Sequence, residues 1–83
     1  MYNDSFLYGL PTLDLHSEDK VNALILVNEF INDNIKLKNK KIIIIHGKGT
    51  GVLKKTVHEY LKKDKRVKYF TLDINIGQTI VFL

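Results

Sequence analysis

The feature that most constrains this chain is a run of four isoleucines, Ile42–Ile45, which leads directly into the hexapeptide HGKGTG at residues 46–51. A continuous β-branched run of this length predicts a strand that is covered on both faces. The hexapeptide has glycine at every second position, and a helical pattern of apolar residues follows at Leu53, Val57 and Leu61. A strand, a glycine-rich turn and a helix in this order are typical of an α/β fold.

The part of the chain before this run predicts a short strand and a long helix. Leu13, Asp14 and Leu15 alternate apolar, acidic and apolar, which indicates a strand with Asp14 on the face opposite the leucines. Ser17 is a favoured N-cap, so we expect a helix over residues 18–36. The helical face expected to be buried comprises Val21, Ala23, Leu24, Val27, Phe30, Ile31 and Ile35.

The part of the chain after the glycine-rich hexapeptide predicts a second helix and two more strands. His58 falls among lysines on the outer face of this helix, where we expect it to be solvated. Strands are expected over Val67–Asp73 and Thr79–Leu83, joined by a turn around Asn75 and Gly77. The expected fold is α/β, of the two-layer α+β type, in the order β-α-β-α-β-β. Its mixed four-stranded sheet carries two helices, and its first three strands can run parallel.

Length and composition limit the domain organisation and the compartment. A chain of 83 residues fits one domain, expected over residues 12–83, with residues 1–11 as an arm that packs on the core. The absence of cysteine excludes disulfide scaffolds, redox motifs and zinc ribbons. No apolar run approaches the roughly 20 residues of a membrane span, and the N-terminus does not resemble a signal peptide. We therefore expect a cytoplasmic protein without a membrane partner.

Positive charge is concentrated in the middle of the chain. Residues 36–68 carry twelve Lys or Arg side chains against two acids, whereas residues 1–35 carry one lysine against six acids. A segment this basic indicates a surface that contacts phosphate. The alternative, that these lysines only keep a small domain soluble, stays open at this point.

The glycine-rich hexapeptide is the strongest candidate for a binding turn. It follows a strand and opens a helix, where glycines allow close backbone approach and free N–H groups attract an anion. It fits neither the P-loop nor the dinucleotide-binding pattern. A turn that needs glycine only for its geometry is the alternative reading. The candidate nucleic-acid-binding residues are Gly47, Lys48, Gly49, Thr50, Gly51, Lys54 and Lys55.

Histidines follow both of the first two predicted strands. Because parallel strands place their carboxyl ends at one edge, His16 and His46 are expected at one rim of the sheet, with Asp14 beside them. Histidine exchanges protons near neutral pH, and a carboxylate can orient it, so these three residues are the candidate catalytic groups. A metal site formed with Asp73 lacks supporting spacing, and metal-free phosphodiester chemistry is favoured.

Together these motifs resemble the small MutS-related (Smr) domain family. The segments LDLH at residues 13–16, HGKGTG at 46–51 and IGQTIVFL at 76–83 occur in the order that the family shows. Two positions depart from the family pattern. Ser17 stands where a glycine usually follows LDLH, and Ile76 stands where a double glycine usually begins.

The resemblance implies a β-α-β-α-β-β fold like that of the C-terminal domain of a bacterial translation initiation factor. It also implies nucleic-acid binding, with endonuclease activity in several members: some nick DNA, and others cut messenger RNA on collided ribosomes. Asp14 and His16 match the family's catalytic DLH, and residues 46–49 match its HGxG substrate-contact turn.

Three functional hypotheses remain from the sequence. The first is an endonuclease that acts on RNA or DNA. The second is a non-catalytic module that docks on nucleic acid or the ribosome. The third is the C-terminal part of a larger MutS-related protein in which a partner domain carries the activity. RNA is the favoured substrate, because its 2′-hydroxyl is a built-in nucleophile that an acid–base pair can activate. We expect no cofactor, with a divalent metal needed only if DNA is cut.

Overall fold

The computed structural model describes residues 9–47, 51–73 and 77–83. The predicted order of elements is confirmed, with these bounds: β1 (Thr12–Asp14), α1 (Lys20–Lys36), β2 (Lys41–Ile45), α2 (Val52–Lys63), β3 (Tyr69–Leu72) and β4 (Gln78–Phe82). Most of the predicted N-terminal arm lies outside the described residues, as do Lys48, Gly49, Thr50, Asn75 and Ile76.

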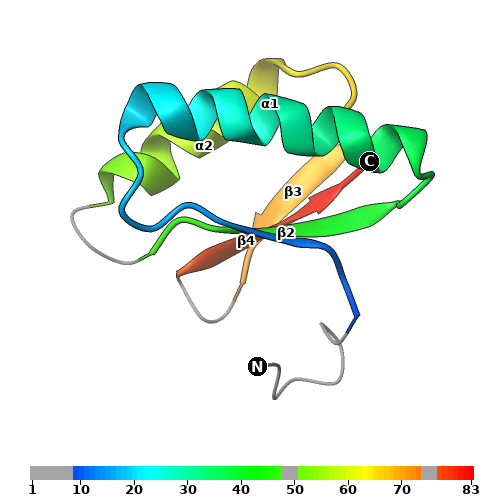
Figure 1. The fold of residues 1–83 in the computed structure, drawn as a ribbon, viewed down its shortest axis with the longest axis horizontal. Helices are drawn as coiled ribbons and strands as arrows, with labels where there is room; N and C mark the ends of the chain where they lie inside the picture. The colour runs from blue at the N-terminus through cyan, green and yellow to red at the C-terminus, as the bar shows by residue number, and fades with distance from the viewer. Residues whose placement is uncertain (1–8, 48–50, 74–76) are drawn as a thin grey trace.

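The sheet is mixed, and its strand order is β1-β2-β4-β3. Strand β1 pairs parallel with β2, while β4 pairs antiparallel with both β2 and β3. The first three strands therefore run in one direction, as expected, but β4 lies between β2 and β3. Both helices cover the same face of the sheet, which gives a two-layer fold (Figure 1). In the part of the chain that the structure describes, no helix is long and apolar enough to cross a membrane.

The hydrophobic core lies between the sheet and the two helices. Alternate residues of β2, Ile42 and Ile44, face the helices and are fully buried. Ile43 points to the other face and is also buried, at 1% exposure. This confirms that the isoleucine run forms a strand covered on both faces. The helices, β4 and the residues that directly follow β1 and β4 contribute Leu15, Ala23, Val27, Ile31, Val57, Leu61, Val81 and Leu83 to the core.

The start of α1 differs from the prediction. The helix begins at Lys20, and its N-cap is Asp19, whose carboxylate accepts a hydrogen bond from the Asn22 backbone N–H at 2.8 Å. Ser17 is not the N-cap, because it sits at φ +75° in a turn that the Glu18 N–H closes onto the Leu15 carbonyl. A positive φ at the third position of a four-residue turn is the type II pattern, which favours glycine.

The buried stripe of α1 is also narrower than expected. Val21 and Ile35 are 69% and 41% exposed, so the prediction that these two residues belong to the core is wrong. The helix instead buries Asn34, whose side-chain amide donates to the Phe30 carbonyl and accepts from Asn39. A polar residue is tolerated there because both ends of its amide are satisfied.

Candidate functional site

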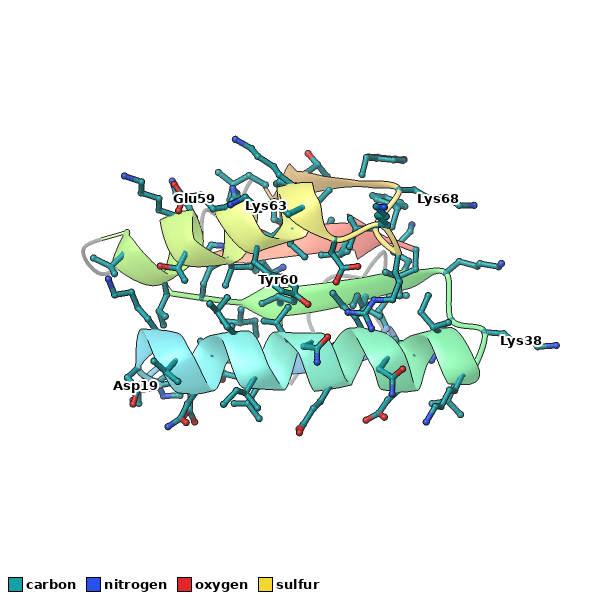
Figure 2. The ribbon with its side chains drawn as sticks, turned by 90° about the horizontal axis from the view of Figure 1, so that it is seen from above. Asp19, Lys38, Glu59, Tyr60, Lys63 and Lys68 are labelled. Carbon is teal, nitrogen blue, oxygen red and sulfur yellow. The ribbon has the colours of Figure 1, made fainter. Side chains whose placement is uncertain are left out.

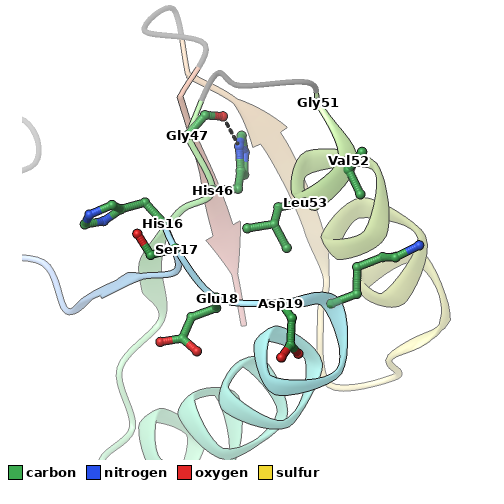
Figure 3. A pocket seen from close by; sticks show the side chains of 10 residues that line it. His16, Ser17, Glu18, Asp19, His46, Gly47, Gly51, Val52 and Leu53 are labelled. Atoms are coloured by element: carbon green, nitrogen blue, oxygen red, sulfur yellow. Dashed lines mark hydrogen bonds between the residues drawn. The ribbon is translucent and has the colours of Figure 1, made fainter.

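A pocket of about 500 Å³ opens where β1 and β2 end and both helices begin. His16, Ser17, Glu18, Asp19 and Lys20 line it on the side of α1. On the side of α2 it is lined by His46, Gly47, Gly51, Val52 and Leu53, as Figure 3 shows. The parallel pairing of β1 with β2 thus brings the two histidines to one rim, as the sequence predicted.

Asp14 and His16 form a hydrogen-bonded pair at this rim. The Oδ1 atom of Asp14 accepts from the His16 backbone N–H at 3.0 Å and lies 2.8 Å from the His16 Nδ1. The His16 and Asp14 side chains are 71% and 50% exposed. The pair forms where β1 ends at Asp14 and the chain turns, because an aspartate side chain can accept from the backbone N–H two residues on.

The pairing sets the protonation of both groups. Hydrogen bonds from the side chain and backbone of His16 lower the pKa of Asp14, so it stays a carboxylate at neutral pH. The hydrogen bond to Asp14 and its negative charge raise the pKa of His16. Because Nδ1 faces the carboxylate, Nε2 is the nitrogen that can exchange a proton with a ligand.

Whereas His16 is exposed on the rim, His46 is buried below it. Its side chain is 5% exposed, with Nδ1 3.1 Å from the Gly47 carbonyl and Nε2 2.8 Å from the Thr79 hydroxyl. The backbone N–H groups of His46 and Gly47 both donate to the Gly77 carbonyl, at 3.0 and 2.9 Å. These bonds fix the start of the glycine-rich turn, where Gly47 has φ +79°. A non-glycine residue would be strained at that angle.

His58 is not solvated, which corrects the sequence-based expectation. Its Nε2 lies 2.7 Å from the Thr79 hydroxyl, and its ring packs edge-on against His46 and tilted against Phe70. The residue lies at the edge of the face of α2 that covers β3 and β4. The spacing of His58 from the buried Leu61, three residues on, is the sequence signal that places it there.

His46, His58 and Thr79 form a hydrogen-bond chain in which the donor and acceptor of each bond can be assigned. Burial is the main cause that lowers the pKa of both His46 and His58, and the positive charge of Lys54 adds to it. Both rings are therefore neutral at pH 7. The Gly47 carbonyl can only accept, so His46 Nδ1 carries the proton and Nε2 accepts from the Thr79 hydroxyl. The Thr79 oxygen then accepts from His58 Nε2–H.

The two described lysine candidates lie on the first turn of α2. Lys54 is partly buried, and it is close enough to His46 and His58 to lower their pKa values. Lys55 is exposed, and its N–H donates to the carbonyl of the N-cap residue Gly51 at 3.0 Å. Gly51 has φ +82° and no side chain to cap the helix. Neither lysine lines the pocket itself.

The described residues contain no cluster of side chains that could form the alternative metal site. Residues 9–47, 51–73 and 77–83 bring together no group of three or more His, Cys, Asp or Glu side chains that could hold an ion. The carboxylate of Asp73 accepts a hydrogen bond from Gln78 instead. Chemistry without a metal stays a prediction.

Comparison with known protein families gives a match over most of this chain. The family model described as the Smr domain matches residues 13–82. The chain belongs to the Smr domain family. That span includes Asp14, His16 and all of the described pocket residues.

The curated relatives of this Smr domain are much longer proteins. Endonuclease MutS2 of Finegoldia magna is 45% identical over 56 residues, which is 68% of this chain and 7% of that protein. Endonuclease MutS2 of Ligilactobacillus salivarius is 43% identical over 60 residues, or 72% of this chain and 8% of that protein. The chain thus spans less than a tenth of the length of these two relatives.

Two solved structures share the fold. The Smr domain of Thermus thermophilus MutS2 is 31% identical, with a TM-score of 0.87 over 89% of this chain and 98% of that one. YdaL, a stand-alone small MutS-related protein from Escherichia coli, is 21% identical, with a TM-score of 0.82 over 87% of this chain and 63% of that one. The expected fold class is confirmed.

Proposed function

We propose that this Smr domain binds nucleic acid at the rim of the pocket and cleaves RNA there with the Asp14–His16 pair. The observation that carries the proposal is the pair itself, which is exposed, hydrogen-bonded at 2.8 Å and next to the glycine-rich turn. The relation to proteins named endonuclease supports the reaction class.

In this mechanism His16 is the general base and Asp14 orients it. Nε2 of His16 takes the proton of the ribose 2′-hydroxyl, and the 2′-oxygen then attacks the adjacent phosphorus. The bond from phosphorus to the 5′-oxygen breaks, and that oxygen takes a proton from the solvent. The products are a 2′,3′-cyclic phosphate and a 5′-hydroxyl end, and His16 returns its proton to the solvent.

The backbone N–H groups of Leu53 and Lys54 at the N-terminus of α2, together with the helix dipole, would hold the phosphate. Charge builds up on the phosphate oxygens during attack, and preorganised N–H groups offset it. Lys54 and Lys55 add positive charge on the same side of the pocket. His46 keeps the turn in place, since both of its ring nitrogens are already hydrogen-bonded.

Cleavage and binding by matched variants test this proposal. We expect Asp14→Asn and His16→Ala each to remove cleavage of a single-stranded RNA while leaving its affinity nearly unchanged. Unchanged cleavage rates in both variants would refute the assignment of the catalytic pair. Binding without cleavage by the wild-type domain would favour the alternative, a non-catalytic docking module.

The salt dependence of binding tests the basic surface separately. Affinity is expected to fall steeply with salt, because each phosphate contact releases counterions. Lys55→Ala should reduce the slope of log affinity against log salt by about 0.7 if this lysine meets one phosphate of a single strand. The control is Lys36→Ala, which removes an exposed lysine from the far end of α1. Equal slopes in the two variants would remove Lys55 from the interface.

A further inference from the structure

A row of three side chains crosses the helix-free face of the sheet. Lys41, Phe82 and Tyr69 are cross-strand neighbours on β2, β4 and β3. Their sequence neighbours Ile42, Val81 and Phe70 face the helices and belong to the core or pack against it. Because side chains alternate along a strand, this row lies on the opposite face.

The row forms a stack that ends at the edge of the sheet. The rings of Phe82 and Tyr69 are 4.3 Å apart and 12° from parallel, and the Lys41 ammonium lies 5.3 Å from the centre of the Phe82 ring. Phe82 therefore has a neighbour on each side. Strand β3 is the last strand in the sheet order, so none of the other described strands lies beside the outer face of Tyr69. Tyr69 is 59% exposed.

Lysines lie at both ends of this stacked row. Lys41 lies in the row itself, Lys68 directly precedes Tyr69, and the Lys68 N–H donates to the Phe82 carbonyl. Figure 2 shows Lys38 at the same end of the molecule as Lys68. Neither the His16–Asp14 pair nor the Arg66–Asp64 ion pair involves these lysines.

We propose that this row is a second nucleic-acid contact, in which an unpaired base stacks on the outer face of Tyr69. Lys68, which directly precedes Tyr69, would contact a phosphate next to that base. An exposed aromatic ring among lysines is the combination that binds single strands, because every unpaired base offers a flat face and every nucleotide a charge. A duplex keeps its base faces stacked inside, so the site selects single strands.

The site rests on the proposed function but lies apart from the pocket. Lys41 begins β2 and His46 follows its end, so about 16 Å of β-strand separates the row from the rim. A nucleic-acid strand that binds at both the rim and the row is held more tightly than one that binds at a single site, because its second contact is intramolecular. The row therefore deepens the proposed function by naming its substrate as single-stranded.

Binding of matched single strands tests the base-stacking site. The probes are a labelled thymidine oligodeoxynucleotide, a uridine oligoribonucleotide in 2′-O-methyl form, and an abasic strand of equal length and charge. We expect Tyr69→Leu to weaken binding of both base-bearing strands by about fivefold or more, without change for the abasic strand. Tyr69→Phe, which keeps the ring, should bind as the wild type does.

A second measurement keeps the test independent of variant stability. In the wild type, the ring protons of Tyr69 should shift on addition of the thymidine strand and stay unchanged with the abasic strand. Ring signals that respond to neither strand, or equal affinities of Tyr69→Leu and Tyr69→Phe, would overturn the inference. If the wild type binds strands while Tyr69 has no effect, the proposed function stands. If it binds none of the three probes, both proposals fail.

Discussion

The substitution Thr79→Val tests the hydrogen-bond chain that supports the glycine-rich turn. Thr79 is fully buried, and its hydroxyl is shared by Nε2 of His46 at 2.8 Å and Nε2 of His58 at 2.7 Å. Valine has nearly the same shape but no hydroxyl. The substitution therefore leaves an acceptor on the buried His46 and a donor on the partly buried His58 without their partner.

The expected loss follows from the burial of these two groups. An unsatisfied buried donor or acceptor costs about 1–3 kcal/mol, and His58 can recover part of that from water because it is only partly buried. We expect the free energy of unfolding to fall by about 2–3 kcal/mol. The total free energy of unfolding of a domain of this size is only about 4–12 kcal/mol, so this loss is a large fraction of it.

Urea denaturation followed by circular dichroism at pH 7.5 measures this loss. Thr79→Ser is the control, because it keeps the hydroxyl and loses one methyl group, at a cost of about 1 kcal/mol. The urea midpoint should fall much further for Thr79→Val than for Thr79→Ser, with an unchanged slope. A Thr79→Val protein as stable as Thr79→Ser would refute the hydrogen-bond chain.

Two further predictions concern stability. Ser17→Gly should raise the free energy of unfolding by about 0.5–1 kcal/mol, measured by thermal or urea unfolding, because φ +75° strains serine and not glycine. An unchanged or lower stability would contradict that strain. Stability should also fall as the pH drops from 7.5 to 5.5, because His46 and His58 have lowered pKa values and bind protons more readily when unfolded. His16 acts in the opposite direction, so the comparison is best made in a His16→Ala background, where a flat profile would argue against neutral buried rings.

The sequence predicted most of the fold because its strongest signals are local. The isoleucine run and the glycine-rich turn define strand β2 and the point where it ends. The alternation of Leu13, Asp14 and Leu15 places Asp14 on the face opposite the leucines. The exposed pair of Asp14 and His16 is also local, since an aspartate at the end of a strand can bond to the residue two positions on. Parallel pairing of the first two strands then accounts for the rim that His16 shares with His46.

What the sequence missed depends on contacts between distant segments. Thr79 joins His46 and His58 across 33 and 21 residues, and this requires β4 to lie beside β2. The sequence of α2 does not show that β4 pairs with β2, so His58 was assigned to solvent although its spacing from Leu61 favours the covered face. Ser17 was misread for a different reason. Its residue type favours an N-cap, but the chain reverses at that point and forces a positive φ.

Cleavage of a strand with one ribonucleotide tests the central claim, proton transfer by the Asp14–His16 pair, most directly. The substrate is a labelled DNA strand that carries a single ribose, incubated with the wild type or His16→Ala in EDTA. We predict that the wild type cuts only at the 3′ side of that ribose and leaves a 2′,3′-cyclic phosphate, while His16→Ala does not cut. The control is the same strand with deoxyribose at every position. Cleavage of this control as fast as the ribose-containing strand, with activity that EDTA abolishes, would contradict the account.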